Sequence, residues 1–136
     1  MSQPSNEPGP VIGSWTIADG ERRQAPFPDG PGVSIVVGAA EGTAMGVLEV
    51  TLPVGGAMPE HDHGDSAVLL APRAGRFRLV EAEEGGRSIE IEAGAVATIP
   101  VGRRVRLENA GDVEARTLVV LTPPDFAERL DGWPAV

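Results

Sequence analysis

Short stretches of alternating polar and apolar residues, separated by glycine and proline, restrict this chain to a β-sheet fold more strongly than any other feature. The sequence has 18 glycines and 13 prolines among 136 residues, and no segment shows the 3.6-residue repeat of a long helix. Apolar residues recur at every second position in 46–52, 76–81, 87–93 and 103–109. This alternation predicts strands with one buried face and one face in water.

Shorter or more continuous apolar runs predict further strands, and together they indicate an all-β sandwich or barrel. The sequence EEGGR at 83–87 predicts a hairpin turn, because glycine adopts positive φ angles readily. The segment 123–132 predicts one short helical turn, which Asp125 would begin and Gly132 would end. The additional strands are expected at 14–18, 33–38, 66–70, 95–99 and 115–121.

The charge balance argues against two classes of partner. Twenty acidic residues against eleven basic ones give a formal net charge of −9. Nucleic acids and anionic membrane surfaces are bound through an excess of Lys and Arg, so neither is an expected partner. All the basic residues are arginine, which fits a GC-rich genome, and we expect a bacterial source.

Length and composition predict one cytoplasmic domain. A chain of 136 residues supports a single core, here over residues 11–136, and we expect residues 1–10 to form a flexible tail. The lack of cysteine excludes disulfides and thiolate metal ligands. No apolar run approaches the ~20 residues of a membrane span, and the N-terminus lacks the pattern of a secretory signal.

The only two histidines, His61 and His63, are one residue apart. On an extended strand, residues i and i+2 point to the same face, about 6.6 Å apart along the strand. Two such imidazoles inside a barrel can converge on one metal ion. The spacing is weak evidence by itself, because it also occurs on exposed strands and loops.

Two glycine-framed motifs around the histidines resemble the cupin family of small β-barrels. The first motif covers residues 55–75 and the second covers 94–109. The resemblance implies an all-β, double-stranded β-helix (jelly-roll) barrel, followed here by a short C-terminal helical turn. It also implies that residues 76–93 form the hairpin between the motifs. The matching positions are Gly55, His61, His63 and Gly75 in the first motif, and Gly94, Pro100, Gly102 and Asn109 in the second.

The chain departs from the cupin pattern at two of its four metal ligands. The family usually holds its metal by two His and a Glu from the first motif and a His from the second. Here Val68 stands at the position of the Glu, or Ala67 if the shorter spacing is counted, and Val105 stands at the position of the second-motif His. The resemblance therefore implies a cupin with an incomplete metal site.

Asp65 is the one residue that can partly replace the missing ligands. It has the same strand parity as His61 and His63, and a set of two His and one carboxylate suits Fe, Mn or Ni, with Zn as a further divalent candidate. The alternative is that residues 64–66 form a turn and Asp65 lies in solvent. By parity, Glu60 and Asp62 are expected to point outward.

Four other residues are candidates for substrate binding. Met58 is close enough to the histidines to line their pocket, and Val68 and Val105 would make its centre apolar. Arg73 could reach the barrel mouth and bind a carboxylate; the alternative is a solvated loop residue.

Two classes of function fit these residues. The first is an enzyme acting on a small organic molecule, either with metal-assisted oxygenase or isomerase chemistry or with His61 or His63 as a metal-free acid/base. The second is a non-catalytic cupin that binds or senses a small molecule. A third reading of the histidines is a vestigial pair without a role. The family resemblance also implies a homodimer.

Overall fold

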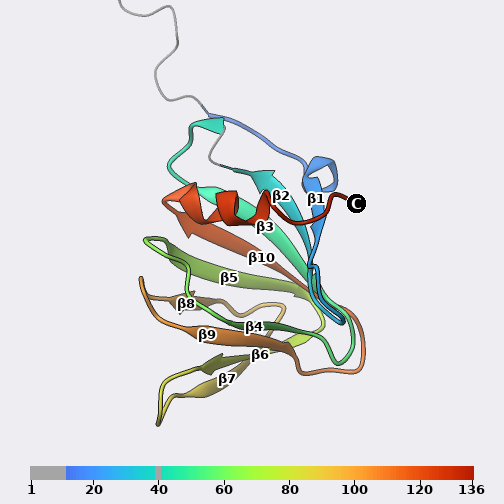
Figure 1. The fold of residues 1–136 in the computed structure, drawn as a ribbon, viewed down its shortest axis with the longest axis vertical. Coiled ribbons are helices and arrows are strands. Elements are labelled where there is room, and N and C mark those ends of the chain that lie inside the picture. Colours follow the sequence, from blue (N-terminus) through green and yellow to red (C-terminus); the bar gives the residue numbers. More distant parts are fainter. Residues whose placement is uncertain (1–11, 39–40) are drawn as a thin grey trace, which may run out of the picture.

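The computed structural model describes residues 12–38 and 41–136, so the predicted tail at residues 1–10 lies outside the described part. Almost all of the regular structure of these described residues is β-strand, with two short 3-10 helices, η1 and η3 (Figure 1). The elements are, in chain order, η1 Ile17–Asp19, β1 Glu21–Gln24, β2 Gly32–Val37, β3 Gly46–Leu52, β4 Ala57–His61, β5 Ala67–Ala74, β6 Arg76–Glu81, β7 Ser88–Glu92, β8 Ala97–Ile99, β9 Val105–Asn109, β10 Ala115–Thr122 and η3 Pro124–Leu130.

The strands form two antiparallel sheets that pack face to face. The large sheet has the order β1-β2-β3-β10-β5-β8, and the small sheet has the order β4-β9-β6-β7. Neighbours such as β3 and β10 are distant in sequence, as they are in a jelly roll. The predicted all-β jelly-roll fold is confirmed.

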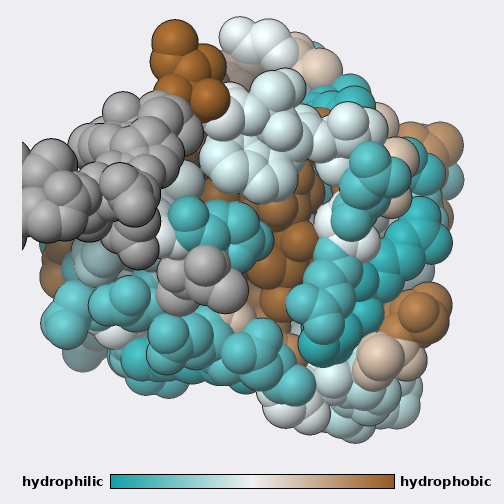
Figure 2. Space-filling model, turned by 90° about the horizontal axis from the view of Figure 1, so that it is seen from above, coloured by the Kyte–Doolittle hydropathy of each residue, from teal (hydrophilic) through white to brown (hydrophobic). Residues whose placement is uncertain are grey.

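The alternation in the sequence produces the core directly. In β3, the residues whose side chains lie between the two sheets are buried, and the residues that alternate with them are partly exposed. Phe77, Leu52 and Leu121 have no exposed surface at all. Seen from above, the surface is hollowed at its centre, with a hydrophobic floor between mostly hydrophilic side chains (Figure 2).

Two of the sequence expectations need correction. The strand expected at 14–18 is wrong, because η1 occupies Ile17–Asp19 and the first strand is β1 at Glu21–Gln24. Strand β4 was not among the predicted strands. Both β1 and β4 are edge strands, and their sequences ERRQ and AMPEH have too few buried positions for an alternation to be visible.

The other predicted elements are confirmed, with shifted ends. Strand β5 continues to Ala74 instead of ending at 70, and the C-terminal helical turn is η3. The hairpin between β6 and β7 closes through a hydrogen bond from Gly86 N to Glu83 O (2.7 Å). Within the described residues, no helix is long and apolar enough to cross a membrane.

Candidate functional site

The two histidines lie at the end of β4 and just beyond it. The strand stops at His61, and His63 opens a turn in which Ser66 N donates to His63 O (3.1 Å). Gly64 has a φ of 60° in this turn, and its N–H donates to Asp62 Oδ1 (2.9 Å). The strand is therefore not regular through His63, yet the two imidazole rings still meet, with centroids 4.6 Å apart.

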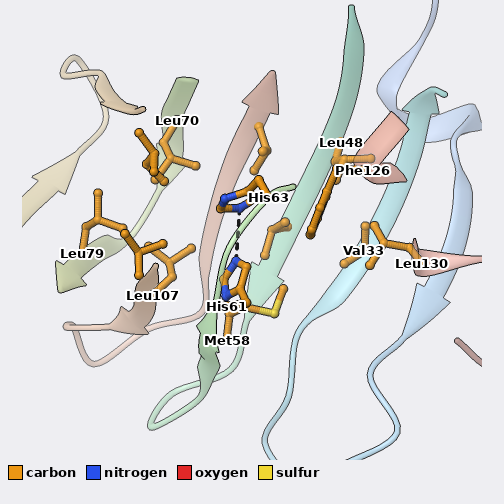
Figure 3. Close-up of a pocket in the computed structure, with 14 residues that line it drawn as sticks. Val33, Leu48, Met58, His61, His63, Leu70, Leu79, Leu107, Phe126 and Leu130 are labelled. Atoms are coloured by element: carbon orange, nitrogen blue, oxygen red, sulfur yellow. Dashed lines mark hydrogen bonds between the residues drawn. The ribbon is translucent and has the colours of Figure 1, made fainter. Parts of the chain in front are cut away.

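The hydrogen bonds fix the tautomers of both rings. His61 Nδ1 is 2.6 Å from Pro59 O, and since a carbonyl only accepts, the Nδ1–H donates. The neutral His61 ring then has a lone pair on Nε2, which accepts from His63 Nε2–H at 3.1 Å (Figure 3). The lone pair of His63 is left on Nδ1, a buried atom without a partner among the described residues.

Both rings are neutral near pH 7. Burial lowers the pKa of His63 from 6.5 to about 4, and the facing His61 adds to the effect. Burial also lowers the pKa of His61 below its ordinary value, although its hydrogen bond to Pro59 acts in the opposite direction. The pair is therefore an uncharged, hydrogen-bonded unit inside the barrel.

The cavity at the pair is small and otherwise apolar. Its volume is about 30 Å³, which is enough for one or two water molecules. Among the described residues that line it, the two imidazoles are the only polar side chains (Figure 3). The lining is Val33, Leu48, Val50, Met58, His61, His63, Leu70, Leu79, Ile99, Val105, Leu107, Val119, Phe126 and Leu130.

The helix η3 closes one end of this cavity. The ring of Phe126 lies 4.7 Å from that of His63, centroid to centroid. Arg129 stacks over Phe126 at 5.1 Å and donates to Asp62 O from Nη1 (3.3 Å). Ser66 Oγ donates to Pro123 O (2.6 Å). These contacts attach η3 to the turn that carries His63.

The residues present do not fit the metal site that the cupin resemblance implies. Two nitrogens bound to one ion at 2.0–2.1 Å lie about 3 Å apart as adjacent ligands, and the two Nε2 atoms match this spacing at 3.1 Å. However, a metal on both Nε2 atoms would move the proton of His63 to Nδ1, which has no acceptor within reach among the described residues. His61 has such an acceptor in Pro59 O.

Residues 12–38 and 41–136 do not supply the missing ligands from elsewhere. No group of three or more His, Cys, Asp or Glu side chains within the described residues could hold an ion. Asp65 lies exposed in the turn after His63, so the structure does not bring it to the histidines. Val105, buried at 2% exposure, pairs with His61 across β4 and β9 and occupies the position of the absent histidine.

The structure brings some of the other candidates to the pair and separates the rest. Met58 and Val105 line the cavity. Val68 is buried in the core but is not part of the cavity lining. Arg73 lies on the outer face of the large sheet, where it forms an ion pair with Glu49. Neither alternative given for Arg73 matches this position, because the residue is away from the barrel mouth and belongs to strand β5 and not to a loop.

One residue at the site, and one next to it in the small sheet, were not found from the sequence. Phe126 belongs to a segment predicted only as a helical turn, and no local pattern shows that it packs on His63. Glu81 follows Phe77 and Leu79 at two-residue spacing, and it pairs in register with Val105. Directly paired residues share a face of a sheet, so Glu81 lies on the inner face of the small sheet. The two-residue alternation in 76–81 already indicated this face.

No protein-family model matches the sequence, and no curated protein matches it. The fold is similar to that of a "predicted oxalate decarboxylase" from Thermotoga maritima, with a TM-score of 0.67 and 15% identity, covering 81% of this chain and 98% of that one. It is also similar to an oxalate oxidase, with a TM-score of 0.71 and 21% identity, covering 90% of this chain and 65% of that one.

A third similar structure is the oxalate decarboxylase of Bacillus subtilis, which has Mn(II) centres. The TM-score is 0.70 at 20% identity, covering 93% of this chain but only 33% of that one. At such identities the likeness concerns the fold. Together with the two glycine-framed motifs and the jelly-roll topology, it shows that this chain has the cupin fold.

Proposed function

We propose that the barrel binds a small, mainly apolar organic molecule, and that a polar group of this ligand bonds to the imidazole pair. The observation that carries the proposal is the lining of the cavity, in which two neutral imidazoles are the only polar side chains. Apolar walls with one or two placed polar groups are typical of small-molecule sites. The cavity of about 30 Å³ accommodates the polar end of such a ligand, and the rest must lie in adjoining space.

Binding is favoured over catalysis by the protonation behaviour of the pair. A general base works best when its pKa is near the working pH, whereas the pKa of His63 is about 4. The part of the chain that the structure describes contributes no carboxylate, hydroxyl, lysine or arginine to the cavity lining that could act as the complementary acid. In a neutral pair, the His63 Nε2–H donor and the His61 Nε2 acceptor can exchange their mutual hydrogen bond for bonds to a ligand, as ligand recognition requires.

An enzyme that transfers a proton through His61 is the second candidate. The observation in its favour is the bond from His61 Nδ1–H to Pro59 O (2.6 Å), which directs the basic Nε2 towards His63 and the cavity (Figure 3). The similar structures include oxalate enzymes, which supports enzymatic chemistry on small molecules in this fold.

The cytoplasmic location and the bacterial source stay predictions.

A fluorescence titration with N-phenyl-1-naphthylamine tests the binding proposal. This probe is apolar, uncharged and carries a single N–H donor. We expect saturable binding that EDTA does not change and that His61→Leu weakens about tenfold, because one hydrogen bond is lost in an apolar site. His61→Gln, which retains a hydrogen-bonding group, is the matched control. Unsaturable binding, or equal affinity in all three proteins, would contradict the proposal.

We also propose that the chain forms a homodimer through the outer face of the large sheet. Val47, Val120 and Leu69 lie side by side on this face in the registers of β3, β10 and β5, and each is only partly buried. A contiguous row of apolar side chains on the outer face of central strands supports an interface there. The adjacent ion pair of Arg73 and Glu49 balances the local charge, so two copies of the face need not repel each other despite the net charge of −9.

A further inference from the structure

We propose that the ligand enters through a cleft in the side of the barrel, between β7 and β8, and that it is an amphipathic acid. Its apolar body lies over Val105 and its anionic group binds Arg103 and Arg87. This inference rests on the proposed binding function and names the ligand class and the route for that site.

The cleft lies where the two sheets are not joined. Strand β8 ends the large sheet and β7 ends the small sheet, so no backbone pairing among the described residues joins the two sheets at the seam between these strands. The cleft at this seam has a volume of about 260 Å³, close to the lower limit of about 300 Å³ for sites of small organic ligands. Its lining is Leu79, Glu81, Arg87, Ile89, Thr98, Ile99, Pro100, Arg103 and Val105.

Three apolar side chains separate the cleft from the histidines. Leu79, Ile99 and Val105 line both the cleft and the histidine cavity. Since a wall of single side chains can move by rotamer changes, cavity and cleft form the deep and shallow parts of one site. The cleft therefore supplies the space that a cavity of about 30 Å³ lacks.

The register of the small sheet defines the length of the ligand. His61 pairs with Val105, and Val105 pairs with Glu81, so these three residues form a row across β4, β9 and β6 on one face. Neighbouring strands are about 4.8 Å apart, which places the backbones of His61 and Glu81 about 10 Å apart. A ligand that reaches from the imidazoles to the charged end of this row has a body of about two fused rings.

The charged end of the cleft favours an anion. Its lining contains two guanidinium groups and one carboxylate. Arg103 pairs with Glu81, and more distantly with Glu83 (3.7 Å). Arg87 forms no salt bridge with any residue that the structure describes. A guanidinium group binds carboxylates and sulfonates through several parallel N–H donors, so an acid in the cleft can take up the unused donors of both arginines.

Entry past η3 is the less favourable route. Phe126 covers His63, and Arg129 and Ser66 connect η3 to the turn that carries His63. Opening that end breaks two hydrogen bonds and the stacking of Arg129 on Phe126 at once. Opening the seam requires only the movement of apolar side chains.

A matched pair of probes separates the ligand class from binding itself. The probe 5-anilinonaphthalene-1-sulfonate has the same ring skeleton as N-phenyl-1-naphthylamine and adds one anionic group on the side of the fused rings opposite the N–H. We expect Arg103→Gln to weaken the sulfonate probe about tenfold and to change the neutral probe by less than about twofold. We expect Glu81→Gln to tighten the sulfonate probe about threefold, because it removes the competitor for Arg103.

Arg106→Gln is the control for net charge. Arg106 is an exposed residue of β9 that pairs with Glu108 at 2.7 Å. It is not part of the cleft lining, so this variant should leave both affinities unchanged. Opposite effects of the variants at 103 and 81 support the proposal, since a merely structural effect would weaken binding in both. If the neutral probe binds as expected and the sulfonate probe is insensitive to Arg103→Gln, this inference is overturned while the proposed function stands. If neither probe saturates, both are overturned.

Discussion

At the scale of single residues, the buried imidazole of His63 makes stability depend on pH. Its pKa is about 4 in the folded chain and 6.5 in its ordinary state, so the unfolded chain takes up the proton first as the pH falls. The free energy of unfolding is therefore unaffected by this group above pH 6.5 and decreases between pH 6.5 and 4. The gap corresponds to about 3 kcal/mol.

Urea unfolding of the wild type and His63→Gln at several pH values measures this contribution. Carboxylates titrate in both proteins, so the difference between the two isolates the imidazole. We expect the stability of the wild type relative to the variant to fall by about 2–3 kcal/mol between pH 7 and 4.5. Parallel curves would show that His63 is not buried in its neutral form.

Gly64 is a second position where one residue determines the local structure. It has a φ of 60°, and a Cβ atom there would lie 2.8 Å from Arg129 Nη2. We expect Gly64→Ala to reduce the free energy of unfolding by about 1–2 kcal/mol, most of it from the left-handed backbone and a smaller part from displacing the flexible side chain of Arg129. Gly102→Ala is the control, because Gly102 also has a positive φ but no atom within 4 Å of the Cβ position.

The double variant Gly64→Ala/Arg129→Ala separates the two causes in a urea unfolding experiment. Removal of the guanidinium group should recover the part of the stability loss by which Gly64→Ala exceeds Gly102→Ala. If Gly64→Ala and Gly102→Ala cost the same, the contact between Arg129 and the turn does not constrain residue 64.

At the scale of elements, η3 depends on Phe126 for its position over the histidines. The ring packs against the core and against His63. We expect Phe126→Ala to cost about 2 kcal/mol of stability, less than a fully buried Phe, and to raise amide hydrogen exchange in residues 61–66 and 124–130. Phe27→Ala is the control, since Phe27 is also partly buried but packs on Trp133 (6.4 Å). Equal exchange at 61–66 in both variants would contradict the role of Phe126.

The elements also show what the sequence could and could not predict. Alternating strands such as β3, β6 and β9 were predictable because one face of each is buried, and the motif frame correctly placed Val105 opposite the histidines. The edge strand β4 and the turn after His63 were not, because edge pairing and turn hydrogen bonds leave no periodicity. The closure by η3 depends on hydrogen bonds between residues 57 and 67 positions apart, which no local pattern contains.

At the scale of the whole molecule, the proposed dimer should depend on the apolar row of the large sheet. Val120 is the middle residue of this row, between Val47 and Leu69, and its side chain points away from the core because its neighbours Val119 and Leu121 are buried. An arginine there keeps the strand intact and places an unpaired charge in the interface. Such a charge costs several kcal/mol when desolvated, so we expect Val120→Arg to be monomeric.

Light scattering after gel filtration measures the mass directly. The wild type should have about twice the chain mass of 14.1 kDa, and Val120→Arg should have the mass of one chain with an unchanged circular dichroism spectrum. Val113→Arg is the matched control, because Val113 is an exposed valine (56%) outside the strands of this face, and it should leave the dimer intact. A wild type that remains monomeric at every concentration, or two variants that behave alike, would show that the outer face of the large sheet does not join two copies. Since the proposed ligand cleft lies at the β7–β8 seam and not on this face, dissociation should leave the affinity for N-phenyl-1-naphthylamine unchanged.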